Sequence, residues 1–219
     1  MKLRKLLALA MAAVRAVSSA SVAMADGPDG LFELNGDRYG SLAEALDKVE
    51  NGQTATITLR DNYTGGGAQF EGTGKIITID LSGFTYTVGE PTVGSVGTET
   101  NGFQLLKGNT VTFKNGTIKA SNYEKLKTVF QNYCDLTLEN VTVDAGDATQ
   151  VQYVASNNNG SLRIEGASNI YAPDGGRAFD VYYWPNNSYT DGVAVTIDTT
   201  GEIVGDIEYG SDGTNSENT

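Results

Sequence analysis

The residues best placed to do chemistry lie in the segment Asp-Gly-Gly-Arg-Ala-Phe-Asp, from Asp174 to Asp180. The chain contains no histidine and a single cysteine, which excludes Ser-His-Asp and Cys-His catalysis, histidine-bound metals and thiolate zinc sites. Two chemistries remain. One is glycoside hydrolysis by two carboxylates about 5–10 Å apart, and the other is calcium-assisted lysis of a polysaccharide with an Arg or Lys base. The candidate catalytic residues for either are Asp174, Arg177 and Asp180.

A surface ion pair beside a glycine turn is the competing interpretation of this segment, and it is favoured. The sequence has no Asp-Asp pair and no Asn-Thr-Asp or Arg-x-Lys cluster of the kind that polysaccharide-cleaving enzymes use. No cofactor is expected, with calcium as the alternative. Asp144 and Asp147 are the candidate metal ligands in that case. The general acidity of the chain could serve cation binding or the solubility of an exported protein, and the second is favoured.

Aromatic side chains are concentrated near the same segment, which also holds the single tryptophan, Trp184. Alternation along a strand places Asp180, Tyr182 and Trp184 on one face and Phe179 on the other. If Phe179 points into the core, the first set forms an exposed platform suited to stacking on sugars. The alternative is that the rings cover the following loop, residues 184–190. The candidate binding residues are Asp180, Tyr182, Trp184, Asn186 and Asn187.

These side chains must be positioned by a repeated strand pattern that runs through most of the chain. Each copy has alternating apolar residues, a polar or glycine-containing corner, and alternating apolar residues again. Such a short unit cannot bury its apolar face alone, so stacking of successive units must build the core. Inward alternation predicts buried columns across the units. The copies are Ile76–Val88, Val111–Ala120, Leu136–Ala145, Leu162–Ala172 and Val195–Asp206.

Further structural predictions come from residues at the corners of the repeats and from residues that precede the first repeat. Asn115 and Asn140 fall at equivalent corners, where asparagine tolerates the left-handed backbone; either they exchange side-chain amide hydrogen bonds or they are independent turn residues. Ahead of the repeats, Asn35-Gly36 predicts a tight hairpin. The Ser41–Glu44 segment then predicts a capping box that begins an amphipathic helix from Leu42 to Glu50. That helix would cover the unpaired end of the first coil.

The first 25 residues have the layout of a secretory signal peptide. Lys2, Arg4 and Lys5 precede an apolar stretch, and small residues lead to a cleavage position before Asp26. The formal net charge is -12, so we expect repulsion of nucleic acid and of anionic lipid. The apolar run is too short for a membrane span, which needs about 20 residues, so no membrane insertion is expected.

The phrase Lys-Ile-Ile-Thr-Ile-Asp-Leu-Ser-Gly, from Lys75 to Gly83, resembles a recurring phrase of right-handed parallel β-helix proteins of the pectate-lyase-like kind. Such phrases are frequent in large repeat surface proteins of Gram-positive gut bacteria. The segments Tyr39–Leu46 and Gly52–Leu59 resemble the helix and first strand with which those proteins begin. The similarity covers roughly Tyr39 to Tyr209 and departs at Ser82, where asparagine is more usual. It implies the fold and a bacterial cell-surface setting, and it implies little about activity.

The sequence therefore predicts an all-β protein, a right-handed parallel β-helix with a short N-terminal capping helix. The expected division is a signal peptide (1–25), a hairpin and capping helix (26–53), β-helix coils (54–210) and a polar tail (211–219). We expect a secreted or cell-surface module without catalysis that adheres to a glycan or a host surface. A polysaccharide lyase or glycoside hydrolase of the β-helix type, and a structural spacer of a longer surface protein, are the alternatives.

Overall fold

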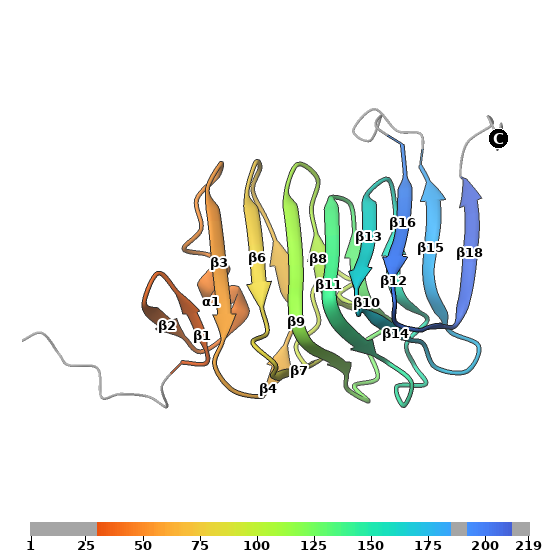
Figure 1. Cartoon of the computed structure of the whole chain (residues 1–219), viewed down its shortest axis with the longest axis horizontal. Helices are drawn as coiled ribbons and strands as arrows, with labels where there is room; N and C mark the ends of the chain where they lie inside the picture. The colour runs from red at the N-terminus through yellow and green to blue at the C-terminus, as the bar shows by residue number, and fades with distance from the viewer. Residues whose placement is uncertain (1–29, 185–191, 212–219) are drawn as a thin grey trace, which may run out of the picture.

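The computed structural model of the chain describes residues 30–184 and 192–211, and within these ranges the protein is all-β with parallel sheets (Figure 1). The larger sheet, sheet A, runs in the order β16 (Ala194–Thr199), β13 (Ser161–Gly166), β11 (Asp135–Asp144), β9 (Thr110–Ala120), β6 (Ile76–Asp80), β3 (Thr54–Leu59), β1 (Phe32–Leu34) and β2 (Asp37–Tyr39). It has two side branches: β7 (Thr85–Gly89) pairs with β9 and carries β4 (Tyr63–Gly66), and β14 (Asn169–Tyr171) pairs with β11 and carries β17 (Ile203–Val204). The second sheet, sheet B, runs in the order β18 (Asp206–Ser211), β15 (Arg177–Tyr183), β12 (Tyr153–Asn157), β10 (Thr128–Asn132), β8 (Asn101–Leu105) and β5 (Ala68–Phe70).

The chain alternates between the two sheets, and each sheet adds strands in chain order. From β3 onward every pairing between strands is parallel; β1 pairs antiparallel with both β2 and β3. Strands β9 and β11 pass through a bend at Asn115 and Asn140, whose φ angles are 59° and 54°. The two asparagines do not bond to each other: Asn115 Nδ2 donates to Asp80 Oδ1 at 3.3 Å, and Asn140 Oδ1 accepts from the Ala167 N–H at 3.0 Å.

The predicted apolar columns are present in the register of sheet A. One column pairs residues 77, 111, 136, 162 and 195, and the other pairs residues 79, 113, 138, 164 and 197. All of these side chains are buried except those of the last strand, where Val195 is partly buried and Ile197 is 52% exposed. The prediction that the last strand is buried too was wrong, because within the described residues no further strand stacks on β16.

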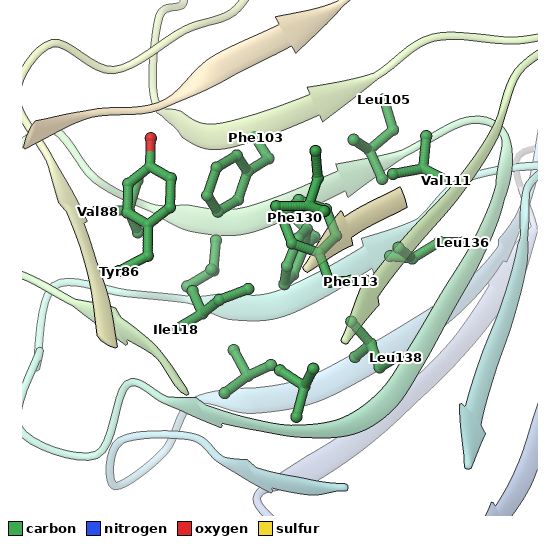
Figure 2. Close-up of a cluster of buried hydrophobic side chains, with 14 of the residues drawn as sticks. Tyr86, Val88, Phe103, Leu105, Val111, Phe113, Ile118, Phe130, Leu136 and Leu138 are labelled. Carbon is green, nitrogen blue, oxygen red and sulfur yellow. The ribbon is translucent and has the colours of Figure 1, made fainter. Parts of the chain in front are cut away.

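Aromatic rings from both sheets meet at the centre of the core (Figure 2). Phe113 of sheet A lies 5.1 Å, between ring centroids, from both Phe103 and Phe130 of sheet B. Tyr86 is also fully buried, and its hydroxyl donates to the Gly66 carbonyl at 2.6 Å. Burial raises the pKa of Tyr86 well above its ordinary value. The inner faces of sheets A and B therefore pack directly against each other.

A hairpin and a helix lie at the N-terminal end of sheet A, where β1 pairs with the edge of β3. Asn35 and Gly36 both have positive φ, 54° and 92°, at the turn between β1 and β2. The helix α1 (Leu42–Leu46) is shorter than the predicted Leu42–Glu50, because the chain tightens after Leu46 into turns with i→i−3 hydrogen bonds. Ser41 Oγ accepts from the Glu44 N–H at 3.2 Å, as in a capping box. Glu44 reaches back to the Gly40 N–H at 2.9 Å instead of to Ser41.

Two predicted segments lie mainly outside the described residues: the signal peptide (1–25) and the polar tail (211–219), of which Ser211 ends β18. Between residues 30 and 211, apart from 185–191, there is no helix long and apolar enough to cross a bilayer.

Deletion of residues 26–53 should make the remaining coils prone to aggregate. The deletion removes β1 from the edge of β3 and exposes the apolar groups under Leu42, Ala45 and Leu46 of α1. Size-exclusion chromatography of the deletion variant should show large species. Ser41→Ala, which removes only the helix cap, should keep the elution volume and cost about 0.5–2 kcal/mol of unfolding free energy. An unaggregated deletion variant with unchanged melting temperature would show that the cap is dispensable.

Phe113→Ala should lower the free energy of unfolding by about 3–5 kcal/mol, because it leaves a cavity among packed rings. Phe113→Leu should cost less, since more of the volume is kept. Ile76→Ala is the matched control, because Ile76 is 50% exposed and its loss should stay within about 0.5 kcal/mol. Urea unfolding of the three variants measures the differences, and equal losses for Phe113→Ala and Ile76→Ala would contradict the central role of the rings.

Candidate functional site

A groove of about 370 Å³ follows the corner at which the chain passes from sheet B to sheet A. Its walls come from successive turns, those after β8, β10 and β12, and from the residues before β16. We name this the corner groove. The residues that line it are Lys107, Gly108, Asn109, Thr110, Tyr133, Cys134, Asp135, Asn159, Gly160, Ser161, Gly192, Val193 and Ala194.

Buried asparagines hold the turns beneath the corner groove. Asn132 Nδ2 donates to Asn157 Oδ1 at 2.8 Å, and Asn157 Nδ2 donates in turn to the Ala194 carbonyl at 3.1 Å. In an earlier coil, Asn109 Oδ1 accepts from the Lys75 N–H at 3.1 Å. Because buried backbone groups need partners, these side chains fix the turns and give the groove a rigid floor. The sequence analysis missed this ladder, although an asparagine ends both β10 and β12.

Trp184 stands beside the corner groove, and Asn159 connects the two. Asn159 Oδ1 accepts from the Trp184 N–H at 2.7 Å, and Asn159 Nδ2 donates to the Trp184 carbonyl. The Asn159 backbone has a φ of 55°, and its N–H donates to the Tyr182 carbonyl at 3.2 Å. The Trp184 side chain is 48% exposed. A groove residue therefore fixes the backbone of an exposed tryptophan.

The groove also has polar groups placed to meet a ligand. Asp135 is exposed, and its Oδ1 accepts from Ser161 Oγ at 2.6 Å across neighbouring strands. Lys107 and Tyr133 contribute a cation and a ring to the lining. Cys134 is buried, and burial raises the pKa of its thiol. Because a thiol with a raised pKa holds little thiolate at neutral pH, Cys134 is poorly suited to act as a nucleophile, and the other lining groups offer hydrogen bonds and ring contact.

Of the predicted binding residues that the structure describes, only Trp184 is exposed. Tyr182 and Trp184 both lie at the C-terminal end of β15 and its exit, and Tyr182 is partly buried. The Tyr182 ring lies against Gly210, where a Cβ would come within 3.3 Å of two ring carbons. Asn186 and Asn187 lie outside the described residues.

Asp180 was predicted to lie on the surface, and this was wrong. The residue is 6% exposed, its carboxylate accepts from Ser156 Oγ at 3.1 Å, and it also accepts from the Asn157 N–H. Burial raises the pKa of this carboxyl, and the two hydrogen bonds oppose the shift in part. Strand alternation identified the outward face correctly, but neighbouring strands supply groups that cover the side chain.

The three candidate catalytic residues do not form one site either. Asp174 is exposed in the turn before β15. Arg177 forms an ion pair with Glu208 of β18, and its guanidinium lies 4.9 Å from the centroid of the Tyr153 ring. Tyr153 also donates its hydroxyl to Glu208 Oε2 at 2.8 Å. The predicted surface ion pair is therefore replaced by one between neighbouring strands of sheet B.

Asp180 and Glu208 are register neighbours on adjacent strands of sheet B, at the end of an outward polar column. Neighbouring strands are about 4.8 Å apart, so this register raises the question of a carboxylate pair like that of a retaining glycosidase, whose carboxyl groups are about 5–5.5 Å apart. Here both carboxylates already have partners inside the protein, and Asp180 is almost inaccessible. Asp180 and Glu208 therefore belong to a structural ladder. The column consists of Gln69, Gln104, Gln131, Ser156, Asp180 and Glu208.

The candidate metal ligands converge on a lysine. Lys119 Nζ lies 3.8 Å from Asp144 Oδ2 and 3.5 Å from Asp147 Oδ2. Asp144 Oδ1 accepts from the Gly146 N–H at 3.0 Å. In the part of the chain that the structure describes, no group of three or more Cys, Asp or Glu residues is placed to hold a metal ion.

Substitutions of Asp180 should distinguish the effect of its charge on stability from the effect of its hydrogen bonds. Because folding favours the protonated carboxyl, ionisation destabilises the fold as pH rises through the raised pKa. Asp180→Asn keeps an acceptor for the Asn157 N–H, so its stability relative to the parent should improve between about pH 4 and pH 7. Asp180→Ala leaves that N–H unpaired and should cost about 1–3 kcal/mol at both pH values. Thermal unfolding at the two pH values tests this, and a difference between parent and Asp180→Asn that does not vary with pH would contradict it.

No protein-family model, no curated protein and no solved structure matches this chain. The features of the molecule that bear on its function are the corner groove, Trp184 and the architecture that holds them.

Proposed function

We propose that the chain is a right-handed parallel β-helix. Support comes from the regular alternation between sheets A and B, from parallel pairing in chain order, and from inward columns that continue from coil to coil. Each coil would contain a strand of sheet A, a second strand after the bend, and a strand of sheet B. Loops at the corners of such a scaffold can vary without disturbing the core, which makes them natural sites for binding.

We further propose that this β-helix is a secreted or cell-surface module that binds a glycan without catalysis. The observation that carries the proposal is the exposed Trp184, fixed at its backbone by Asn159 beside the corner groove. A flat ring with a fixed backbone can stack on a sugar at low entropic cost. Export of the protein is supported by the layout of residues 1–25.

The corner groove would supply the polar part of recognition. A volume of about 370 Å³ lies within the range of small-molecule sites, which starts at about 300 Å³. Asp135 and Ser161 offer acceptors and a donor, and Asn159 lies between them and Trp184. Sugar hydroxyls can both donate and accept, so a row of such groups next to a ring suits them.

Binding by one such site should be weak. A single aromatic anchor typically contributes about 2 kcal/mol to a contact, which is far below the free energy of tight binding. Strong adhesion would then need many copies on one surface, each adding to the effective concentration of the others. This fits a module displayed on a cell better than a free enzyme, because Asp180 is nearly inaccessible.

Trp184→Ala should abolish glycan binding and leave the fold intact. Because Trp184 is the single tryptophan, its fluorescence reports directly on ligands that stack on the ring. A glycan array with the mature protein should identify the class of sugar, and titration with that sugar should change the emission. Trp184→Phe should retain part of the affinity, since a smaller ring remains.

Ile76→Ala is the matched control for this test, because Ile76 has nearly the same exposure, 50% against 48%, on the outer face of β6. It should bind like the parent protein. Unfolding of Trp184→Ala would show that the ring is structural. Unchanged binding by Trp184→Ala would move the site elsewhere, and a folded parent that binds no glycan would favour the role of a structural spacer.

A further inference from the structure

A second cavity, of about 240 Å³, lies between α1 and β5 and shares no lining residue with the corner groove. We name it the helix pocket. Its floor is the apolar end of the core, because Leu46, Phe70 and Ile77 line it and are at most 4% exposed. Val93 adds a further apolar side chain to the lining. In Figure 1, α1 lies at the orange end of the stack, whereas β15, which leads to Trp184, lies at the blue end.

Lys75 lines the helix pocket with a side chain that is only 9% exposed. Among the described residues it is the one lysine or arginine that is buried. Its backbone is fixed on both sides, because its N–H donates to Asn109 Oδ1 at 3.1 Å and its carbonyl accepts from the Thr110 N–H at 2.9 Å. Gly72 leaves room for the side chain, since a Cβ there would lie 2.7 Å from Lys75 Cε. The lysine is therefore folded against the protein.

The ammonium group of Lys75 has no partner within residues 30–184 and 192–211: it forms no ion pair and donates no hydrogen bond there. Burial of a charge without a partner is unfavourable, and buried lysines are usually paired. No side-chain nitrogen or oxygen of the described residues is both inaccessible and unpaired. The Lys75 Nζ atom must therefore reach open space, and the helix pocket is the cavity that this residue lines. An anionic group in that cavity would supply the missing partner.

Two carboxylates belong to the same lining. Asp47 directly follows α1 and Glu71 directly follows β5, and both residues are exposed. The helix pocket thus presents one cation, two anions and an apolar floor. A ligand that carries both charges and an apolar side chain would meet all of these groups.

The charge of the chain and the size of the cavity narrow the ligand further. The formal net charge is -12, and a field of this sign repels free anions but acts little on a molecule without net charge. The volume of about 240 Å³ is below the range of about 300–1,000 Å³ that is typical of sites for drug-sized ligands. A small zwitterion satisfies both conditions.

We propose that the helix pocket binds a free α-amino acid with an aliphatic side chain, such as leucine. The carboxylate of the ligand pairs with Lys75. Its ammonium group faces Asp47 and Glu71, and its side chain lies on the apolar floor. This activity is independent of the proposed glycan binding, because the two sites have no residue in common.

Calorimetric titration of the whole protein with three related molecules tests the proposal. The probes are L-leucine, isocaproate, which lacks the amine, and isoamylamine, which lacks the carboxylate. Leucine should bind, and isocaproate should bind at least about tenfold more weakly, because it loses an ion pair and is repelled by the acidic chain. Isoamylamine should not bind. High salt should narrow the difference between leucine and isocaproate, since it screens the repulsion.

Lys75→Met keeps the apolar stem and removes the charge. It should weaken leucine binding at least about tenfold, and it should raise the melting temperature of the ligand-free protein, because an unpaired buried charge is lost. Lys114→Met is the matched control, since Lys114 lies on the outer face of β9 and pairs with Asp80, and it should bind leucine like the parent. Ala43→Phe, at an exposed lining residue, should fill the pocket and abolish binding without a change in the core.

A parent that binds neither L-leucine nor L-valine at millimolar concentrations overturns the proposal, as does a Lys75→Met variant with the affinity of the parent. Isocaproate that binds as tightly as leucine overturns the role assigned to Asp47 and Glu71. Isoamylamine that binds more tightly than leucine overturns the role of Lys75. Trp184→Ala should bind leucine like the parent, so failure of this site and failure of the glycan site give different results.

Discussion

Register between parallel strands is the constraint on which the rest of this structure depends. A single strand exposes a row of apolar side chains that it cannot bury by itself. In-register pairing places Leu136 directly between Val111 and Leu162, so each strand helps to cover the apolar row of its neighbours. A shift of one residue would turn each inward row outward. The stacked rings of Phe103 and Phe130 show the same rule in sheet B.

At the corners between the two sheets, the backbone N–H and C=O groups are not paired within a sheet. They need other hydrogen-bond partners. Asn132 and Asn157 provide them on the side of the corner groove, with amides that bond from coil to coil. Asn159 extends the same role to Trp184. Structural asparagines and the proposed binding residues thus share one edge of the molecule, and the rigidity of the first supports the second.

The two ends of the stack are unequal. At the N-terminal end, α1 and β1 supply both the apolar cover and the backbone partners that a first coil lacks. At the other end of sheet A, Ile197 of β16 is 52% exposed, and within the described residues β16 pairs with β13 alone. Burial of an inward row thus depends on a neighbouring strand on each side.

The sequence by itself determined which side chains face inward, the hairpin at Asn35-Gly36 and the cap at Ser41, because alternation, turn geometry and capping act over a few residues. Only the tertiary structure decided what covers each outward side chain. Asp180 is buried by Ser156 and Asn157, and Arg177 finds Glu208, through contacts between neighbouring strands of sheet B. The corner groove likewise combines turns far apart in the chain. The positions of these turns relative to one another depend on packing across the whole stack of strands, and local sequence patterns carry no information about that packing.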